Sequence, residues 1–312
     1  MTPRSYLYVP GNRGDRLDKA LRTGSDAVIL DLEDAVPLSA KADARETVRA
    51  FVRQSREPDD PQLWVRVDPA HLAEDLDAAA GPRTRGVVLP KAEPDSVAEL
   101  DDRLRAAEEA NGLAPGCLAV IGLIETAIGV LNAPRVAAGP RVVRLGIGEA
   151  DLAGELGIQP DEQRTQLWGI RTQLVLAAAA AGQARPIGPV LTAVHDHALL
   201  RQSTQTLLRQ GFRARTALHP GQVAIINETF SPTPDEVARA RAVLRALAEH
   251  QAQGQGAFLD ESGQLVDPAT VRASRDIVAT ADRLAATASA PGRGTPDVPP
   301  EGTMFPVNET SG

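Results

Sequence analysis

Charged side chains recur in this chain where short apolar runs end and helical segments begin. These residues are Asp31, Glu33, Asp34, Arg66, Lys91, Glu125, Glu149 and Asp151. If the apolar runs are parallel strands of a barrel, their carboxyl ends meet at one rim, which brings these side chains together. Because strand side chains alternate between two faces, Asp31, Arg66 and Glu125 should point toward the barrel axis. Charge is costly there unless it binds something.

Paired carboxylates with room for water suit Mg²⁺ or Mn²⁺, which take oxygen ligands and keep open positions for a substrate. Glu125 and Asp151 are the best candidates for such a pair. The alternative is a rim of salt bridges with Arg66 and Lys91. Asp34 is weaker as a ligand, since it could simply cap the following helix.

The remaining candidate groups are less informative. His195 and His197 fall in a predicted loop, where a solvated position is expected, whereas His219 could face the rim. No spacing matches a histidine-based zinc site. The single cysteine, Cys117, precedes an apolar run and is expected to be a small core residue.

The elements that must position these side chains alternate along the chain. Apolar runs resembling strands are expected at residues 6–9, 27–32, 63–67, 86–90, 118–124, 142–147, 190–194 and 215–218. A helical segment follows each of them, and strands that alternate with helices imply parallel pairing. Eight such units in series predict a closed (β/α)8 TIM barrel. An open doubly wound sheet is the alternative, but no glycine-rich phosphate loop follows the first strand.

The barrel should occupy residues 1–230, and a C-terminal extension should follow at residues 231–289. Two further helices are expected at residues 234–250 and 268–288. Between them, residues 254–266 contain three glycines and should form a lid. Residues 290–312 are rich in proline, glycine, threonine and serine, which predicts a disordered tail.

Composition excludes several partner classes. The net charge is −8 and the arginines are dispersed, so no nucleic-acid footprint is expected. No apolar stretch is long enough to span a membrane, and no signal peptide is recognised, so we expect a cytoplasmic protein. An anionic substrate would need a local cluster of cations, or a metal, to overcome the negative background.

Several motifs, taken in order from about Arg4 to about Leu284, resemble one family. They are residues 4–13 (RSYLYVPGNR), 27–36 (AVILDLEDAV), 65–67 (VRV), 89–91 (LPK), 123–127 (LIETA), 148–152 (GEADL), 218–220 (LHP), 256–258 (GAF) and 266–267 (VD). The pattern resembles the citrate lyase β-subunit-like family of the HpcH/HpaI aldolase superfamily.

The resemblance implies an enzyme that makes or cleaves a bond between a 2-oxo acid and the methyl carbon of an acyl thioester of coenzyme A. It implies Glu125 and Asp151 as Mg²⁺ ligands and Arg66 as the residue that binds the 2-oxo acid. Backbone amides from Gly148, Glu149 and Ala150 through Asp151 would hold the acid's carboxylate.

The resemblance also implies a homo-oligomer, which we expect to be a homotrimer or a hexamer. Asp267, on the lid, matches an acid/base residue that reaches a neighbouring subunit's site. Arg13 and Lys19 match basic positions that meet the nucleotide end of coenzyme A.

Two positions depart from the family pattern. The family commonly has Gly-Ala-Glu-Asp where this chain has residues 148–151 as Gly-Glu-Ala-Asp, and strand seven usually carries an acidic residue where this chain is read as Ala193. Two other functions therefore stay open: a pyruvate-type aldolase acting on free hydroxy acids, and a citrate lyase β-like subunit that is inactive or works only with an acyl-carrier protein. Which thioester is used is not specified by the sequence.

Overall fold

A computed structural model describes residues 2–54, 57, 59–252, 258–259, 263 and 265–288. The chain divides into two compact units, the first running from Thr2 to Asn227 and the second beginning at Glu228. The predicted tail, residues 290–312, lies outside the described residues, as does most of the predicted lid.

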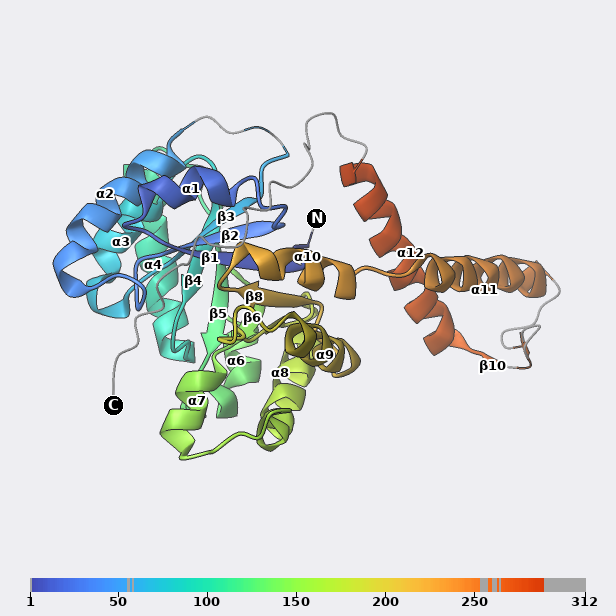
Figure 1. Cartoon of the computed structure of the whole chain (residues 1–312). Helices are drawn as coiled ribbons and strands as arrows, with labels where there is room; N and C mark the ends of the chain where they lie inside the picture. The colour runs from blue at the N-terminus through green and yellow to red at the C-terminus, as the bar shows by residue number, and fades with distance from the viewer. Residues whose placement is uncertain are drawn as a thin grey trace. The chain divides into compact units, whose positions relative to one another are not determined.

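The first unit is a closed barrel of eight parallel strands, which confirms the predicted fold (Figure 1). The strands are β1 (Ser5–Pro10), β2 (Ala27–Asp31), β3 (Gln62–Arg66), β4 (Thr84–Leu89), β5 (Ala119–Ile124), β6 (Val142–Ile147), β7 (Ile187–Gly188) and β8 (Ala214–Ala217). Each strand pairs with its neighbour in sequence, and β8 closes the barrel against β1.

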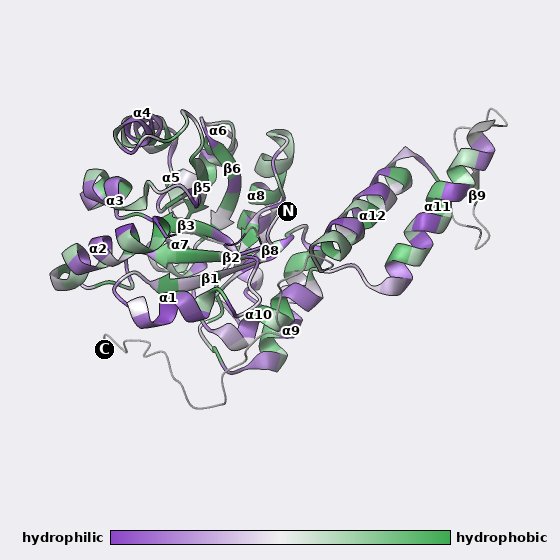
Figure 2. Ribbon diagram, turned by 90° about the horizontal axis from the view of Figure 1, so that it is seen from above, coloured by the Kyte–Doolittle hydropathy of each residue, from purple (hydrophilic) through white to green (hydrophobic). Residues whose placement is uncertain are grey.

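Helices cover the outside of this barrel. They are α1 (Gly14–Ala20), α2 (Lys41–Val52), α3 (Leu72–Ala79), α4 (Pro94–Ala110), α5 (Ala127–Leu131), α6 (Ala133–Ala137), α7 (Glu149–Leu156), α8 (Trp168–Ala180), α9 (His197–Arg209) and α10 (Pro220–Thr229). Short 3₁₀ turns occur at η1 (Leu38–Ala40), η2 (Pro69–His71) and η3 (Thr165–Leu167). Figure 2 shows the strands as mainly hydrophobic ribbons and the helices as mixed hydrophobic and hydrophilic ones.

The barrel interior is filled by alternate residues of the strands. Buried side chains in this cluster include Tyr6, Ile29, Trp64, Ile121 and Leu123. Continuing the same alternation places Asp31, Arg66 and Glu125 on the inner face at the strand ends. The predicted inward direction of these charged side chains is confirmed, because all three line the cavity at this end of the barrel.

Strand seven differs from its prediction. The apolar run at 190–194 is not a strand; the barrel instead uses the two residues of β7. Pro186 and Pro189 bracket this strand, and Pro189 cannot donate a ladder hydrogen bond, so pairing ends there. Beyond it, Val194 N–H donates to the Thr192 carbonyl in a local turn. Ala193 therefore does not lie on the strand.

One smaller prediction is also corrected. Cys117 is exposed rather than buried. Its N–H donates to the Ala114 carbonyl in a turn, and β5 starts two residues later, so the residue never enters the core.

The second unit contains a pair of helices, α11 (Pro234–Ala252) and α12 (Pro268–Ala288), with the short strands β9 (Phe258–Leu259) and β10 (Leu265–Val266) between them. β9 and β10 pair antiparallel. Leu247, Val266 and Val271 form its cluster of buried apolar residues. Within the described ranges of the chain, no helix is long and apolar enough to cross a membrane.

Candidate active site

A cavity of about 670 Å³ opens at the carboxyl ends of the barrel strands. Its lining comes from all eight strands and from the segments that follow several of them. The charged residues in that lining are Arg13, Arg16, Asp31, Asp34, Arg66, Glu125, Glu149, Asp151 and Arg164. In a barrel of this kind the chemistry is performed at this end.

Arg66 is held rigidly on one side of the cavity. Its Nε and Nη2 each lie 2.7 Å from the two carboxylate oxygens of Asp31, which is almost completely buried. Asp31 also accepts the backbone N–H groups of Glu33 and Ala35. The Arg66 guanidinium lies 5.0 Å from the centre of the Tyr8 ring. The Nε and Nη2 edge of the guanidinium therefore donates to Asp31 and is not available to a substrate.

The remaining nitrogen of Arg66 faces two further acids. Its Nη1 lies 2.8 Å from Glu33 Oε2 and 3.3 Å from Asp34 Oδ2. The Glu33 contact has no hydrogen-bond geometry, so it is an attraction of charges alone. Burial raises the pKa of Glu33 to about 8; Arg66 opposes the shift, and Asp34 and Glu125 add to it. Asp34 is exposed, and its carboxylate forms an ion pair with Arg66.

Glu125 stands at the end of β5 and is 4% exposed. Its Oε1 accepts the backbone N–H of Lys91 at 2.9 Å. Lys91 has a φ of +48°, a left-handed conformation that a residue with a side chain adopts only under constraint. Burial raises the pKa of Glu125 to about 7, and the nearby charge of Asp151 raises it further.

Asp151 lies in the first turn of α7, exposed, and lines the same cavity. The residues present fit a hard divalent cation. Glu125, which is buried and has a raised pKa, and Asp151 line the same cavity and interact through their charges. A Cβ at Gly148 would collide with the Glu125 carboxylate, so glycine leaves room for that side chain. Over the residues that the structure describes, no group of three or more His, Cys, Asp or Glu side chains has metal-binding geometry.

Glu149 does not present its carboxylate as a free group. It is 2% exposed and lies in an ion pair with Arg171 of α8, at 2.6 Å from Nε and 3.0 Å from Nη2. Arg164 Nη1 approaches the same carboxylate at 3.5 Å. The set of backbone amides expected to hold the substrate's carboxylate is also smaller than predicted. Gly148 N–H already donates to the Ile124 carbonyl. Glu149, Ala150 and Asp151 form the start of the helix, where amide N–H groups have no partner within the helix.

The basic residues expected at the coenzyme are only partly in place. Arg13 lines the cavity and pairs with Asp15 at 2.8 Å. Lys19 is exposed in the last turn of α1 and is not among the residues of the cavity wall. Arg16, which the sequence reasoning missed, lines the cavity one turn of α1 earlier. Burial, together with repulsion from Arg13, lowers the pKa of Arg16.

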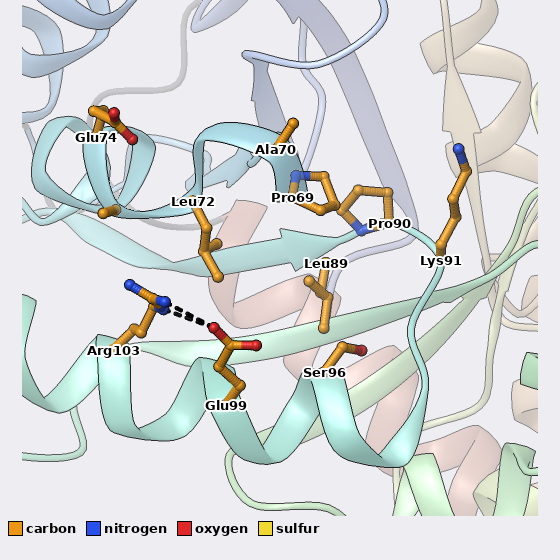
Figure 3. Close-up of a pocket in the computed structure, with 11 residues that line it drawn as sticks. Pro69, Ala70, Leu72, Glu74, Leu89, Pro90, Lys91, Ser96, Glu99 and Arg103 are labelled. Carbon is orange, nitrogen blue, oxygen red and sulfur yellow. Dashed lines mark hydrogen bonds and ion pairs between the residues drawn. The ribbon is translucent and has the colours of Figure 1, made fainter.

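A second, smaller cavity of about 360 Å³ lies outside the barrel between α3 and α4 (Figure 3). Lys91 is among the residues of this outer cavity and not among those of the inner one, which corrects its expected place on the inner rim. Glu99 and Arg103 also lie here, paired at 2.8 Å on α4. The contact of Lys91 with the barrel cavity is the hydrogen bond that its backbone N–H donates to Glu125.

Two other predicted groups lie elsewhere. His219 Nδ1 accepts the Gly221 N–H, and its ring stacks edge-on against His195 at 5.4 Å; neither ring lines the barrel cavity. Asp267 belongs to the second unit, where its Oδ1 accepts the Thr270 N–H at 2.8 Å and so caps α12. These hydrogen bonds lower the pKa of Asp267.

Comparisons with known proteins place the chain among characterised relatives. Residues 4–220 match the model of the family described as HpcH/HpaI aldolase/citrate lyase. A citrate lyase subunit beta-like protein of Deinococcus radiodurans is 34% identical over 88% of this chain and 96% of its own length. A (3S)-malyl-CoA thioesterase of Cereibacter sphaeroides is 32% identical over 91% of this chain and 96% of its own.

A human mitochondrial citramalyl-CoA lyase is 29% identical over 90% of this chain and 86% of its own. Among solved structures, CitE of Mycobacterium tuberculosis in complex with magnesium, acetoacetate and coenzyme A superposes with a TM-score of 0.72 at 30% identity. That match covers 89% of this chain and 98% of the CitE chain.

Proposed function

Because the chain belongs to the HpcH/HpaI aldolase/citrate lyase family, we propose that it is a carbon–carbon lyase acting on a carboxylated 3-hydroxyacyl thioester of coenzyme A. Its products are a 2-oxo acid and a shorter acyl thioester, or the reverse in condensation. The observation that carries the proposal is that the buried Glu125, Asp151 and a fixed Arg66 line one cavity at the carboxyl ends of the strands. That arrangement suits an α-hydroxy acid whose hydroxyl loses its proton.

The chemistry can be followed through the bonds. The hydroxyl of the substrate gives up a proton, and the bond between its carbon and the thioester's α-carbon breaks. The hydroxyl carbon becomes the carbonyl of the 2-oxo acid, while the electron pair passes to a thioester enolate. That enolate then takes a proton at carbon to give the acyl thioester.

We propose that Glu125 and Asp151 hold Mg²⁺ or Mn²⁺. When bound, such an ion supplies Lewis acidity to the substrate's hydroxyl and carboxylate oxygens. Arg66 adds a fixed positive charge through Nη1, since Asp31 holds its other edge in place. The amides of Glu149 and Ala150 at the start of α7 would orient the carboxylate.

The remaining roles are proposals that rest on the family pattern. Arg13, and with less structural support Lys19, would meet the nucleotide end of coenzyme A; Arg16 is a better-placed cation for the same task. We also propose a cytoplasmic homotrimer or hexamer in which Asp267 of one protomer acts as an acid/base group in a neighbour's site. The helix cap that Asp267 forms is the competing role for this residue.

The test is a cleavage screen over malyl-, citramalyl-, citryl- and hydroxymethylglutaryl-coenzyme A, with Mg²⁺ and with a chelator. Release of the oxo acid, which is acetoacetate from hydroxymethylglutaryl-coenzyme A and a 2-oxo acid from the other three, is measured separately from release of free thiol. We expect 2-oxo acid without stoichiometric thiol, and no turnover in the chelator. Asp151→Ala serves as the matched control.

Some relatives carry the name (3S)-malyl-CoA thioesterase, so hydrolysis is the second candidate. It would release free thiol alongside an intact hydroxy acid. Turnover of free hydroxy acids would instead indicate a pyruvate-type aldolase. Activity that requires an acyl-carrier protein, or none at all, would identify a dependent or inactive subunit.

A further inference from the structure

Arg164 is a cavity residue that the proposed reaction does not use. It lines the barrel cavity from the loop that follows α7. Its φ is +54° and its ψ +40°, a left-handed conformation that is unfavourable for a residue with a side chain. Such strain persists where the surrounding structure enforces it, and it is often found at ligand sites.

The loop around Arg164 supplies that enforcement. Arg164 N–H donates to the Asp161 carbonyl at 2.9 Å, and the Asp161 carboxylate accepts the Thr165 N–H at 2.9 Å. Gln166 Oε1 in turn accepts the Asp161 N–H at 3.0 Å. These hydrogen bonds join residues on both sides of Arg164 and fix the backbone of the loop at residues 161–166. The arginine is therefore presented toward the cavity by a braced loop.

The charges around Arg164 do not balance. Glu149 is the one carboxylate that Arg164 approaches in the described part of the chain, at 3.5 Å, and Glu149 is already engaged by both donors of Arg171. Arg215 is buried close by and bonds to carbonyl and hydroxyl oxygens such as Pro189 O and Ser203 Oγ. Arg164 and Arg171 thus share the Glu149 carboxylate, and Arg215 adds a third positive charge close by without an ion pair of its own in the described part of the chain. This wall of the cavity favours an anion.

The anion must belong to the reacting end of the substrate. Glu149, which Arg164 approaches, begins α7 only two residues before Asp151, a rise of about 3 Å along the helix axis. Asp151 is a proposed metal ligand. The nucleotide phosphates of coenzyme A are separated from the thioester by the whole pantetheine arm, whereas the 2-oxo acid fragment lies at the metal.

We propose that Arg164 binds a second carboxylate on the 2-oxo acid fragment, so that the enzyme prefers a dicarboxylic 2-oxo acid over a monocarboxylic one. This inference rests on the proposed lyase function and deepens it by naming the substrate class. Arg66 and the start of α7 hold the first carboxylate, and Arg164 holds the second. A planar guanidinium with unused donors matches that group.

Binding tests the proposal without relying on turnover. Malate and lactate share a carboxylate and an adjacent hydroxyl, but only malate has a second carboxylate. Titration calorimetry with Mg²⁺ should show that wild type binds malate more tightly. Arg164→Gln should weaken malate binding by about 10- to 100-fold, the usual effect of losing a charged hydrogen bond, and change lactate binding far less. Equal losses for the two acids would overturn the proposal.

Steady-state kinetics in the condensing direction provides a second test of the role of Arg164. In the condensing direction acetyl-coenzyme A is held constant while glyoxylate, pyruvate or oxaloacetate is varied. The ratio of kcat/KM for oxaloacetate to that for pyruvate should fall about 10- to 100-fold in Arg164→Gln. The same ratio for Arg164→Lys should lie between the values for wild type and Arg164→Gln, because lysine retains a charge without the planar fork. An unchanged ratio with a raised KM for acetyl-coenzyme A would assign Arg164 to a coenzyme phosphate and overturn the proposal.

The controls separate structural effects from recognition. Glutamine and lysine meet the same backbone strain as arginine at this φ, so the variants differ in side-chain charge and shape. Arg105→Gln, an exposed arginine on α4 paired with Asp101, should leave both ratios unchanged. If wild type condenses none of the three acids, the proposed lyase function fails, while the malate and lactate titration still decides the role of Arg164.

Discussion

The buried ion pair between Glu149 and Arg171 makes the most quantitative prediction. Both side chains are nearly inaccessible, and two hydrogen bonds of 2.6 and 3.0 Å join them. Replacing Glu149 by Met removes the carboxylate and leaves Arg171 with Gln210 Oε1, which lies 3.2 Å from its Nη1. An arginine deprived of its carboxylate in this position is an uncompensated buried charge.

The magnitude follows from that loss. Removing one partner of a buried ion pair costs about 3–5 kcal/mol of folding free energy. For a domain of roughly 150–250 residues, each 1 kcal/mol lowers Tm by about 2–4 °C, so Glu149→Met should lower Tm by roughly 6–20 °C. Glu149→Gln should lose about half as much, since its amide oxygen can accept one of the two bonds.

Differential scanning calorimetry of a double-mutant cycle measures the effect. Arg171→Met alone should also be costly, because Glu149 would keep only the 3.5 Å contact with Arg164. The double variant Glu149→Met with Arg171→Met should be more stable than either single variant, since neither charge is then buried without its partner. Single variants within about 2 °C of wild type, or a double variant with the sum of both losses, would refute the reasoning.

Three further predictions concern the proposed chemistry. Asp151→Ala should abolish Mg²⁺ binding and activity together; normal metal affinity by calorimetry would show that Asp151 is not a ligand. Arg66→Lys should lower kcat/KM by about 10-fold or more, because lysine cannot keep the bidentate contact with Asp31 and also face the substrate, and a near-normal value would count against this. Asp267→Asn should lower turnover strongly while sparing metal binding, and mixing these chains with Arg66→Ala chains should restore partial activity; no recovery in proven mixed oligomers would exclude a shared site.

Metal affinity should also depend on pH through Glu125. Its pKa in the metal-free fold is raised to about 7, mainly by burial, so protons compete with Mg²⁺ for this carboxylate. The raised pKa makes the metal-free protein less stable as pH rises from the ordinary carboxyl range to about 7, with no further loss from this group above it. Mg²⁺ affinity should therefore rise with pH up to about 7 and then level off. Calorimetry in buffers of different ionisation enthalpy would detect the released proton, and a pH-independent affinity would contradict the assignment.

Much of the fold and the inner site could be predicted because the period of two along a strand is a strong signal. Alternation in β2, β3 and β5 gave the inward direction of Asp31, Arg66 and Glu125 correctly, and all three line one cavity. The partner of Arg66 was not predictable from the same pattern. Its bidentate bond to Asp31 depends on the pairing of Asp31 with Arg66 across β2 and β3, which is a property of the register.

The predictions for strand seven and for the Lys91 side chain were wrong. The apolar run at 190–194 satisfied the strand pattern, but prolines at 186 and 189 left only two residues between them for the ladder. Val88 belongs to the interior cluster, so the alternation along β4 points Lys91 outward, and the expected place of its side chain on the inner rim misread the two faces of this strand. Residues 254–257, 260–262 and 264, where most of the lid was predicted, lie outside the described residues.

The position of the acidic residue at the start of α7 decides where its charge lies. Successive helix positions are turned by about 100°, so a carboxylate at residue 149 points in a different direction from one at residue 150. At 149 it reaches Arg171 on α8 and is buried there, while Ala150 lines the cavity without adding charge. Glu149 lines the cavity but is paired with Arg171, so Glu125 and Asp151 remain as the carboxylates proposed to hold a metal. Arg164, which shares Glu149 with a stronger partner, retains the positive charge on which discrimination between one and two substrate carboxylates depends.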